Sequence, residues 1–379
     1  MAHRALNLLG LSEQQASQNI QVFRDYDEQL LEQQQSIYHD EQKVFETHRN
    51  AMAELEHLFD SDQRHQDEYP EHNRENRHEN HHRVMEKNMS DLRQRFFIED
   101  CPVRGEVVHL EEALQTILAQ RPYQPAVQVL LGEMLSATAL LASTLKIKGR
   151  ISLQIQASGT FRWGMAECNH LGEVRALADY ENDPHFEQAQ DSSVVLSTLQ
   201  NPVLFINIEP EFGERYQGIV PLDQPTLAGC LMQYYDLSAQ IPTHIVLATT
   251  AERSGGLLIQ LLPRNNEEEQ QLIDEDIWPR LIMLTGTLKA DELTDLPANE
   301  ILYRLYNEEQ VRLPEQEQLK FGCTCSKERC AAALQQIGVD AVRETLAEQN
   351  PIQMDCQFCQ ARYTFTAEEA LGLFGEHLS

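Results

Sequence analysis

Four cysteines near the C-terminus carry the clearest chemistry in this sequence. Cys323 and Cys325 form a CxC pair, and Cys356 and Cys359 form a CxxC pair, with thirty residues between the two pairs. Two close thiol pairs brought together by a loop are the ligand set of a tetrahedral zinc ion. The CxC pair is more cramped than the usual CxxC and can also close a local disulfide. The pattern therefore predicts a zinc site that could release its metal under oxidation, with a purely structural zinc site as the alternative.

The charge balance excludes some classes of partner. The chain of 379 residues has a net charge of −30, whereas binding to nucleic acid or an anionic membrane requires a basic surface. We therefore expect neither partner. No run of about eighteen apolar residues predicts a membrane span, and the first fifteen residues do not resemble a signal peptide. Eight cysteines without such a signal favour a reducing compartment, which indicates the cytoplasm.

The N-terminal part is strongly polar. Residues 1–60 are predicted to be a helical extension, because apolar residues recur every seven positions from Phe23 to Leu58. Residues 61–91 form a polar, His-rich linker with too few apolar residues to bury a core. Its five histidines are those of a solvated linker, with adventitious metal binding as the alternative: His65, His72, His78, His81 and His82.

Residues 92–264 have the pattern of an α+β domain with a mainly antiparallel sheet. An extended segment precedes a helix that begins near Glu111, and residues 126–146 predict a long, buried apolar helix. Alternation at Ile151, Leu153 and Ile155 indicates a half-buried strand. Residues 226–238 predict a helix, and Gly255–Gly256 predicts a turn or bulge. Further strands are predicted over residues 194–198, 202–210, 216–222, 244–250 and 255–263.

The remaining chain divides into an acidic segment and the cysteine module. Residues 265–320 are charged and helix-prone, and Pro279 and Pro297 interrupt them. Tyr303 and Tyr306 are predicted to pack there. Apolar stripes that could pack marginally contain Trp278, Leu281, Ile282, Leu284, Ile301, Leu302, Leu305 and Tyr306. The cysteine module spans residues 321–379.

Residues from about Met89 to Ser379 resemble heat-shock protein 33, a family of bacterial redox-regulated holdase chaperones. Five strings carry the resemblance in the family's order: CPVRGEVVHL (101–110), GERYQGIV (213–220), SGGLLIQLLP (254–263), LPANEILYRLYNEE (296–309) and FGCTCSKERC (321–330). A sixth string, MDCQFCQARYTF (354–365), contains the closing cysteine pair.

The resemblance implies a chaperone core, a metastable helical linker and a C-terminal zinc domain. It implies that Cys323, Cys325, Cys356 and Cys359 hold one zinc ion in an inactive reduced form and act as the redox switch. Proximity favours the local disulfides Cys323–Cys325 and Cys356–Cys359 over crosswise pairing, and local disulfides would not span the gap that zinc had spanned. The expected partners are unfolding client proteins, together with a second copy of the chain after oxidation. Cys330 matches a position outside the zinc set.

The first 60 residues resemble, more weakly, the cytosolic tail of glutathione-gated potassium/proton antiporters, through ALNLLGL, FRDYDEQLL and HDEQ. The membrane part of such a transporter is absent from this sequence. A gene fusion and a wrongly assigned start would both account for this segment.

Two other classes of function compete with the chaperone. One is a structural zinc-ribbon module that binds another protein. The other is a thiol oxidoreductase that uses Cys356 and Cys359, but the βαβ context of such enzymes is missing around them. Cys101, Cys168 and Cys230 are predicted to be small core residues. No nucleophile–base spacing accompanies the polar residues Arg104, Glu106, Glu214, Arg215 and Tyr216, so we expect structural roles for them and no enzymatic activity.

Overall fold

The computed structural model describes residues 91–99, 101–144, 148–262 and 276–375. The helical extension predicted over residues 1–60 lies outside this described part, as does all of the His-rich linker except Asp91.

The first of two six-stranded sheets begins with a hairpin, which resolves the predicted extended segment into β1 (Leu92–Ile98) and β2 (Val103–Leu110). Its main path runs β10–β1–β2–β9–β8, and β11 also pairs with β1. All of these pairings are antiparallel. The other strands are β8 (Thr243–Thr249), β9 (Ser254–Leu261), β10 (Val311–Arg312) and β11 (Glu317–Gln318).

The second sheet has the order β12–β5–β4–β3–β6–β7 and is antiparallel except at the pair β12–β5. The alternation predicted at Ile151, Leu153 and Ile155 is confirmed, because all three side chains are buried. The strands are β3 (Gly149–Ser158), β4 (Phe161–Asn169), β5 (Glu173–Tyr180), β6 (Gln200–Pro210), β7 (Tyr216–Pro221) and β12 (Lys320–Phe321). The predicted α+β class with mainly antiparallel sheets is therefore confirmed.

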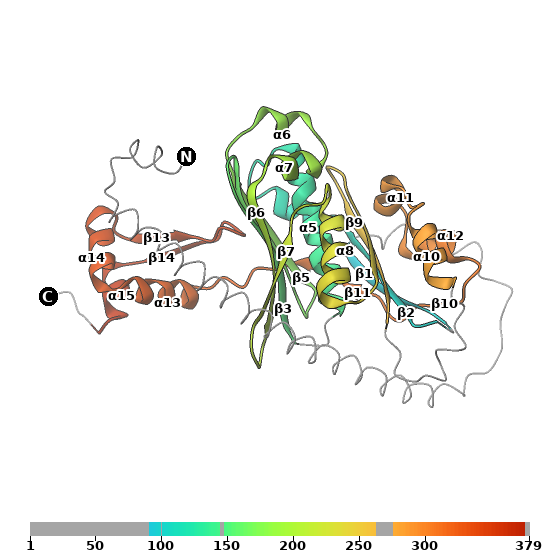
Figure 1. Cartoon of the computed structure of the whole chain (residues 1–379). Coiled ribbons are helices and arrows are strands. Elements are labelled where there is room, and N and C mark those ends of the chain that lie inside the picture. Colours follow the sequence, from blue (N-terminus) through green and yellow to red (C-terminus); the bar gives the residue numbers. More distant parts are fainter. Residues whose placement is uncertain (1–90, 100, 145–147, 263–275, 376–379) are drawn as a thin grey trace, which may run out of the picture. The chain divides into compact units, whose positions relative to one another are not determined.

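Helix α5 (Pro125–Thr144) lies between the two sheets and forms the centre of the larger apolar core (Figure 1). It is long and apolar enough to cross a membrane by length and composition, but 83% of its apolar window is buried inside the protein. Shorter helices close this core: α4 (Glu112–Leu118), α6 (Pro184–Gln188), α7 (Ser192–Thr198) and α8 (Leu227–Tyr234), which continues as a π-helical turn, Tyr235–Ala239.

The strand predicted over residues 194–198 is instead part of α7. The β-branched residues Val194 and Val195 favour a strand locally. However, the Asp191 side chain accepts a hydrogen bond from the Ser193 backbone N–H at 2.8 Å and caps the helix. Val195 then packs into the core from the helix.

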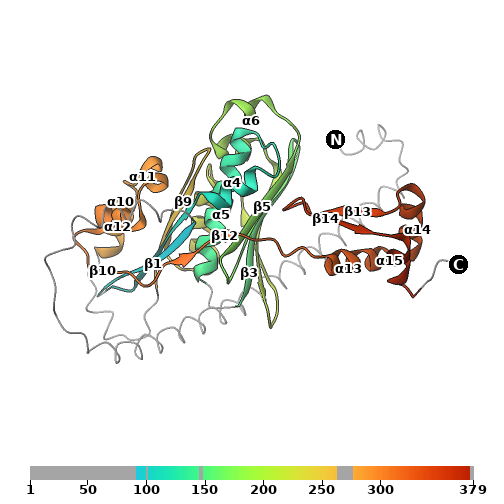
Figure 2. The same cartoon turned by 180° about the vertical axis from the view of Figure 1, so that it is seen from behind.

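Three helices cover the face of the first sheet that points away from α5: α10 (Ile277–Thr285), α11 (Ala290–Asp295) and α12 (Ala298–Tyr306) (Figures 1 and 2). They bury a second apolar cluster against this sheet. Its sheet residues, which we call the covered face, are Phe96, Ile98, Val103, Val107, Ala248, Leu257 and Ile259. Its helix residues are Ile277, Leu281, Leu293, Ala298, Ile301, Leu302, Leu305 and Tyr306.

Tyr306 lies at the centre of this contact, and Tyr303 does not. The Tyr306 ring is 1% exposed, lies 5.8 Å from the Phe96 ring centroid and shares a hydrogen bond of 2.5 Å with Thr285. Tyr303, three residues earlier on the same helix, is 72% exposed. The prediction that both tyrosines pack is therefore right for Tyr306 and wrong for Tyr303.

The glycine pair Gly255–Gly256 lies inside strand β9, so the predicted turn or bulge is wrong. A Cβ on Gly255 would lie 2.6 Å from the Leu293 carbonyl oxygen of α11, and one on Gly256 would lie 2.8 Å from Leu140 of α5. The two glycines thus let a helix approach the strand backbone closely from each face of the sheet.

A segment from Val311 to Phe321, which we call the strap, connects the three covering helices to the cysteines. It pairs with both ends of β1 through β10 and β11 and then runs parallel to β5 through β12. Arg93 forms an ion pair with Glu317, and the Gln94 side chain donates to the Pro314 carbonyl at 2.8 Å. The strap therefore touches both sheets through short, mostly exposed pairings.

After the strap, the C-terminal module has a small apolar core of its own. A two-stranded hairpin packs with three helices around Leu334, Val342, Ile352, Phe365 and Ala370. The elements are α13 (Lys327–Ile337), α14 (Val339–Glu348), β13 (Ile352–Asp355), β14 (Arg362–Phe365) and α15 (Ala367–Gly372).

We predict that acid weakens the docking of α11 through His109. Its Nε2–H donates to the Leu293 carbonyl at 2.9 Å, and burial lowers the pKa of His109 to about 4. The undocked chain would bind a proton near the ordinary pKa of 6.5, so docking is fully stable above that pH and is lost as the pH falls towards 4. The loss is about 2 kcal/mol at pH 5.

Hydrogen exchange of the α11 amides between pH 7.5 and pH 5 measures this effect, after correction for intrinsic exchange rates. His109→Gln keeps an N–H donor that does not titrate. All carboxylates are the same as in the wild type, so their titration contributes equally to both proteins. Docking in this variant should depend less on pH, and an unchanged pH dependence would contradict the prediction.

Candidate metal centre

The four cysteines predicted from the sequence converge on one cluster of sulfur atoms. All four Sγ atoms lie within 4.8 Å of one another. The Cys323 and Cys356 Sγ atoms are 3.5 Å apart, and those of Cys325 and Cys359 are 3.3 Å apart. A tetrahedral zinc ion with Zn–S bonds of about 2.3 Å needs sulfur atoms about 3.8 Å apart. The cluster therefore fits one tetrahedral cation held by four thiolates.

Local backbone geometry presents each pair. The CxC pair lies between β12 and α13, whose N-terminus is capped by the Ser326 side chain. The CxxC pair forms the turn between β13 and β14. There the Cys356 N–H donates to the Ala361 carbonyl at 2.8 Å, and Gln360 adopts a left-handed φ of 57°. A tight turn at one pair and a helix cap at the other direct the sulfurs of both segments to one point.

Neighbouring groups polarise the sulfurs unequally. The Tyr363 hydroxyl donates to Cys325 Sγ at 3.0 Å. Burial raises the pKa of the Cys323 and Cys359 thiols. Burial also acts to raise the pKa of Cys325, but hydrogen bonds from Tyr363 and the neighbouring thiols lower it to about 7. Tyr363 carries no signal in the sequence pattern, because its hydroxyl reaches Cys325 only in the folded module.

The remaining cysteines lie apart from this cluster, which is the only group of metal-binding side chains found among the described residues. Cys168 and Cys230 are buried in the larger core, and burial raises the pKa of both thiols. Cys101 packs against the covered face and Cys330 against the small core of the C-terminal module. The predicted core positions agree with the structure for Cys168 and Cys230, whereas Cys101 is only partly buried.

The five polar residues for which structural roles are predicted lie in the two sheets or on an exposed loop. Arg104 donates to Gln260 Oε1 at 2.8 Å, and Glu106 accepts from Arg95 at 2.6 Å, inside the first sheet. Glu214 and Arg215 lie on the exposed loop before β7. The Tyr216 hydroxyl shares a hydrogen bond of 2.7 Å with Tyr234. The contacts of Arg104, Glu106 and Tyr216 stabilise the sheets, and these five residues assemble no nucleophile with a base.

Comparisons with known proteins agree with both resemblances. A family model described as Hsp33 protein matches residues 91–366, and one described as the C-terminal domain of the potassium efflux system KefB matches residues 1–81. A 33 kDa chaperonin of Ectopseudomonas mendocina is 42% identical over 287 residues, which cover 76% of this chain and 96% of the relative. The corresponding protein of Shewanella denitrificans is 40% identical with the same coverage.

The fold also matches a solved structure. The crystal structure of a 33 kDa chaperonin from Thermotoga maritima superposes with a TM-score of 0.65 over 75% of this chain and 98% of that chain, at 19% sequence identity. At this identity the likeness concerns the fold alone.

Proposed function

Because this chain belongs to the Hsp33 family of chaperones, we propose that it is a redox-regulated, ATP-independent holdase that binds unfolding proteins in the cytoplasm. We assign residues 92–264 to the chaperone core, 265–320 to a metastable linker and 321–379 to the redox-switch domain. One observation carries the proposal. The four-sulfur cluster lies at the end of the strap, and the strap continues from the helices that hide the covered face.

In the reduced form, Cys323, Cys325, Cys356 and Cys359 would hold one zinc ion. Bound zinc keeps these sulfurs as thiolates and links two segments that are thirty residues apart. The five buried residues of the module's core are few for a domain of this size. The metal is therefore expected to supply most of the folding free energy of the module, on the order of 10–16 kcal/mol.

Peroxide would convert each cysteine pair to a disulfide by a two-electron oxidation. One thiolate Sγ attacks the O–O bond, which breaks to give a sulfenic acid and a hydroxide ion that takes up a proton to form water. The second thiolate of the pair then attacks that sulfur and displaces a second hydroxide, which also becomes water. Each disulfide thus consumes one peroxide and two protons and yields two water molecules.

Every sulfur lies within reach of every other in the folded cluster, and crosswise neighbours are as close as 3.3–3.5 Å. The local pairs Cys323–Cys325 and Cys356–Cys359 are therefore proposed because one and two residues separate their cysteines in the chain. Local disulfides close very short loops and restrict the unfolded chain little. The module would therefore lose both its metal and its fold, although it has gained covalent bonds.

Unfolding of the module would remove one anchor of the strap and destabilise helices α10–α12. The covered face would then be open to clients, because apolar patches of this kind bind exposed apolar segments. The same surface could pair two oxidised copies. The net charge of −30 helps to keep the opened form in solution.

Light scattering of a thermally aggregating client tests this function with reduced, zinc-loaded protein and with peroxide-oxidised, zinc-depleted protein. We expect only the oxidised form to suppress aggregation, and Cys330→Ser should behave like the wild type. If neither form acts, the proposal fails in favour of a structural zinc module that binds another protein. If both forms act equally, the protein is a chaperone that its cysteines do not control.

A further inference from the structure

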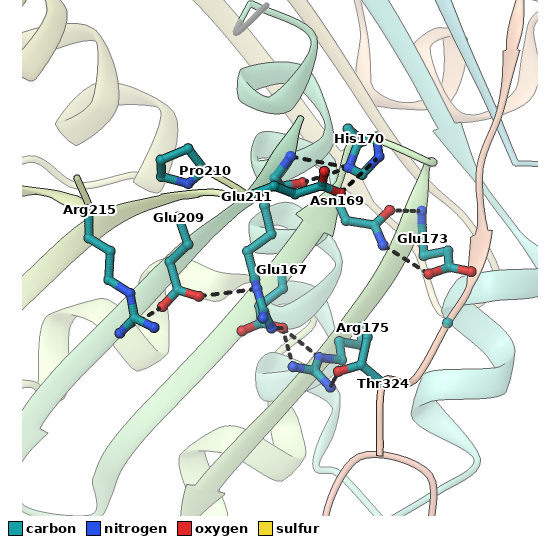
Figure 3. A pocket seen from close by; sticks show the side chains of 13 residues that line it. Glu167, Asn169, His170, Glu173, Arg175, Glu209, Pro210, Glu211, Arg215 and Thr324 are labelled. Atoms are coloured by element: carbon teal, nitrogen blue, oxygen red, sulfur yellow. Dashed lines mark hydrogen bonds and ion pairs between the residues drawn. The ribbon is translucent and has the colours of Figure 1, made fainter. Parts of the chain in front are cut away.

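Arg175 projects from strand β5 of the second sheet and is held in place by a partly buried ion pair. Its Nε and Nη2 atoms both lie 2.5 Å from Glu167 Oε2 on the neighbouring strand β4 (Figure 3). The two side chains are only 12% and 14% exposed. Because Glu167 holds one edge of the guanidinium, the remaining nitrogen, Nη1, is directed elsewhere.

That nitrogen reaches the cysteine cluster. Nη1 lies 3.2 Å from Thr324 Oγ1 and 3.8 Å from Cys323 Sγ. The guanidinium carbon lies 4.1 Å from the centroid of the Phe358 ring. In the sequence, Phe358 lies between the two cysteines of the CxxC pair. One side chain of the core therefore touches both of the segments that supply sulfurs.

The strap brings the CxC pair to this position. Strand β12 runs parallel to β5, and the Gly322 N–H donates to the Val174 carbonyl at 3.1 Å. A Cβ on Gly322 would lie 2.5 Å from the Cβ of Glu173, so the approach requires a glycine. Cys323 follows directly and lies beside Arg175.

We propose that Arg175 is a positioning residue for the metal centre and couples metal occupancy to the docking of the strap. This inference rests on the proposed function. Four thiolates with one divalent cation carry a net charge of −2, and a fixed, half-desolvated guanidinium stabilises that charge. A donor to a ligand sulfur also makes the thiolate less nucleophilic towards oxidants. Groups in this position typically change metal affinity 10- to 100-fold.

The coupling acts in both directions, because linkage between two equilibria is reciprocal. If the contact of Arg175 with the cluster stabilises bound metal, then bound metal stabilises the pairing of β12 with β5. Conversion of Cys323 to a disulfide removes its negative charge, so Arg175 keeps its ion pair with Glu167 but loses its attraction to the Cys323 thiolate. The change at sulfur is thereby transmitted to the second sheet at the point where the strap joins it.

The test is the rate of zinc transfer from the reduced, full-length protein to a chromogenic chelator. Arg175→Ala is expected to release zinc about tenfold faster than the wild type. Arg175→Lys should lie between the two, because one ammonium cannot engage Glu167 and Cys323 as a fork does. Arg150→Ala is the matched control, since Arg150 pairs with Glu167 and Glu209 of the same pocket within the core.

A second variant covers the case in which Arg175→Ala fails to fold. Phe358→Ala removes the ring under the guanidinium, leaves the Arg175–Glu167 pair intact and should also release zinc faster than the wild type. Hydrogen exchange should show that zinc removal deprotects the Lys320 and Gly322 amides more in the wild type than in Arg175→Ala.

Release rates of the Arg175 and Phe358 variants within twofold of the wild type, with equal zinc content, would overturn the inference while leaving the proposed function intact. Absence of bound zinc from the reduced wild type would instead refute the proposed function. Zinc stoichiometry is therefore measured first.

Discussion

Removal of zinc under reducing conditions is expected to unfold the C-terminal module and to leave the two-sheet core folded. Among its described residues the module buries a core of just Leu334, Val342, Ile352, Phe365 and Ala370, whereas the two-sheet core buries a large apolar cluster around α5. Without a metal, the four sulfurs no longer link the CxC and CxxC segments. The expected loss is on the order of 10 kcal/mol, more than such a small domain can spare.

Hydrogen exchange with mass spectrometry, before and after a chelator is added with excess thiol reductant, measures this directly. Amides of α13, α14 and the β13–β14 hairpin should lose protection, while those of α5 and β9 should keep it. Cys330→Ser should behave as the wild type does, because this position packs against the small core and lies outside the sulfur cluster. Retained protection in the zinc-depleted module would show that its apolar core suffices.

Tyr306→Ala should give a protein that holds clients without any oxidant. Removing a buried aromatic side chain typically costs about 3–5 kcal/mol, and here the ring packs on Phe96 and bonds to Thr285. Tyr306 is the one buried aromatic side chain of α10–α12, whose other buried apolar side chains are aliphatic. The docking equilibrium should therefore shift towards the open form and expose the covered face.

Tyr303→Ala is the matched control, since it makes the same substitution on the same helix at a position that is 72% exposed. Both variants should keep stoichiometric zinc under reducing conditions, and only Tyr306→Ala should suppress aggregation of a thermally unfolding client. If Tyr306→Ala frees α10–α12 in hydrogen exchange yet stays inactive, exposure of this face is not sufficient for holding clients.

Much of the core and the cysteine cluster could be predicted because their signals are local or rely on rare residue types. The alternation around Leu153 indicates a strand with one buried face, and the long apolar run of α5 indicates a helix buried on all sides. The CxC and CxxC pairs have few chemical interpretations, so their convergence could be predicted although thirty residues separate them. Their role as zinc ligands and redox switch remains a proposal.

The features that sequence patterns missed depend on contacts between distant residues. Gly255 resembles a turn residue until α11 is placed against it. Tyr303 and Tyr306 are the same residue type on the same helix, and only the docked position of α12 shows that Tyr306 faces the sheet and Tyr303 does not. Strap pairings of two residues each are too short to leave a periodic pattern. Arg175 is a polar residue within a strand, and only the fold brings it to Cys323, 148 positions away.

The strap also sets how the proposed switch would turn off. Only Asn307–Gln310 separate α12 from the strand that pairs with the end of β1. Even with its far end free and α10–α12 undocked, the strap remains part of the same chain as β9, so its effective concentration at its binding edge is in the millimolar range. Closure after reduction is then a first-order step, with a rate that does not depend on protein concentration. Clients must compete for the covered face with α10–α12 of the same chain. Weakly binding native proteins are therefore rejected, while chains with several exposed apolar segments are retained.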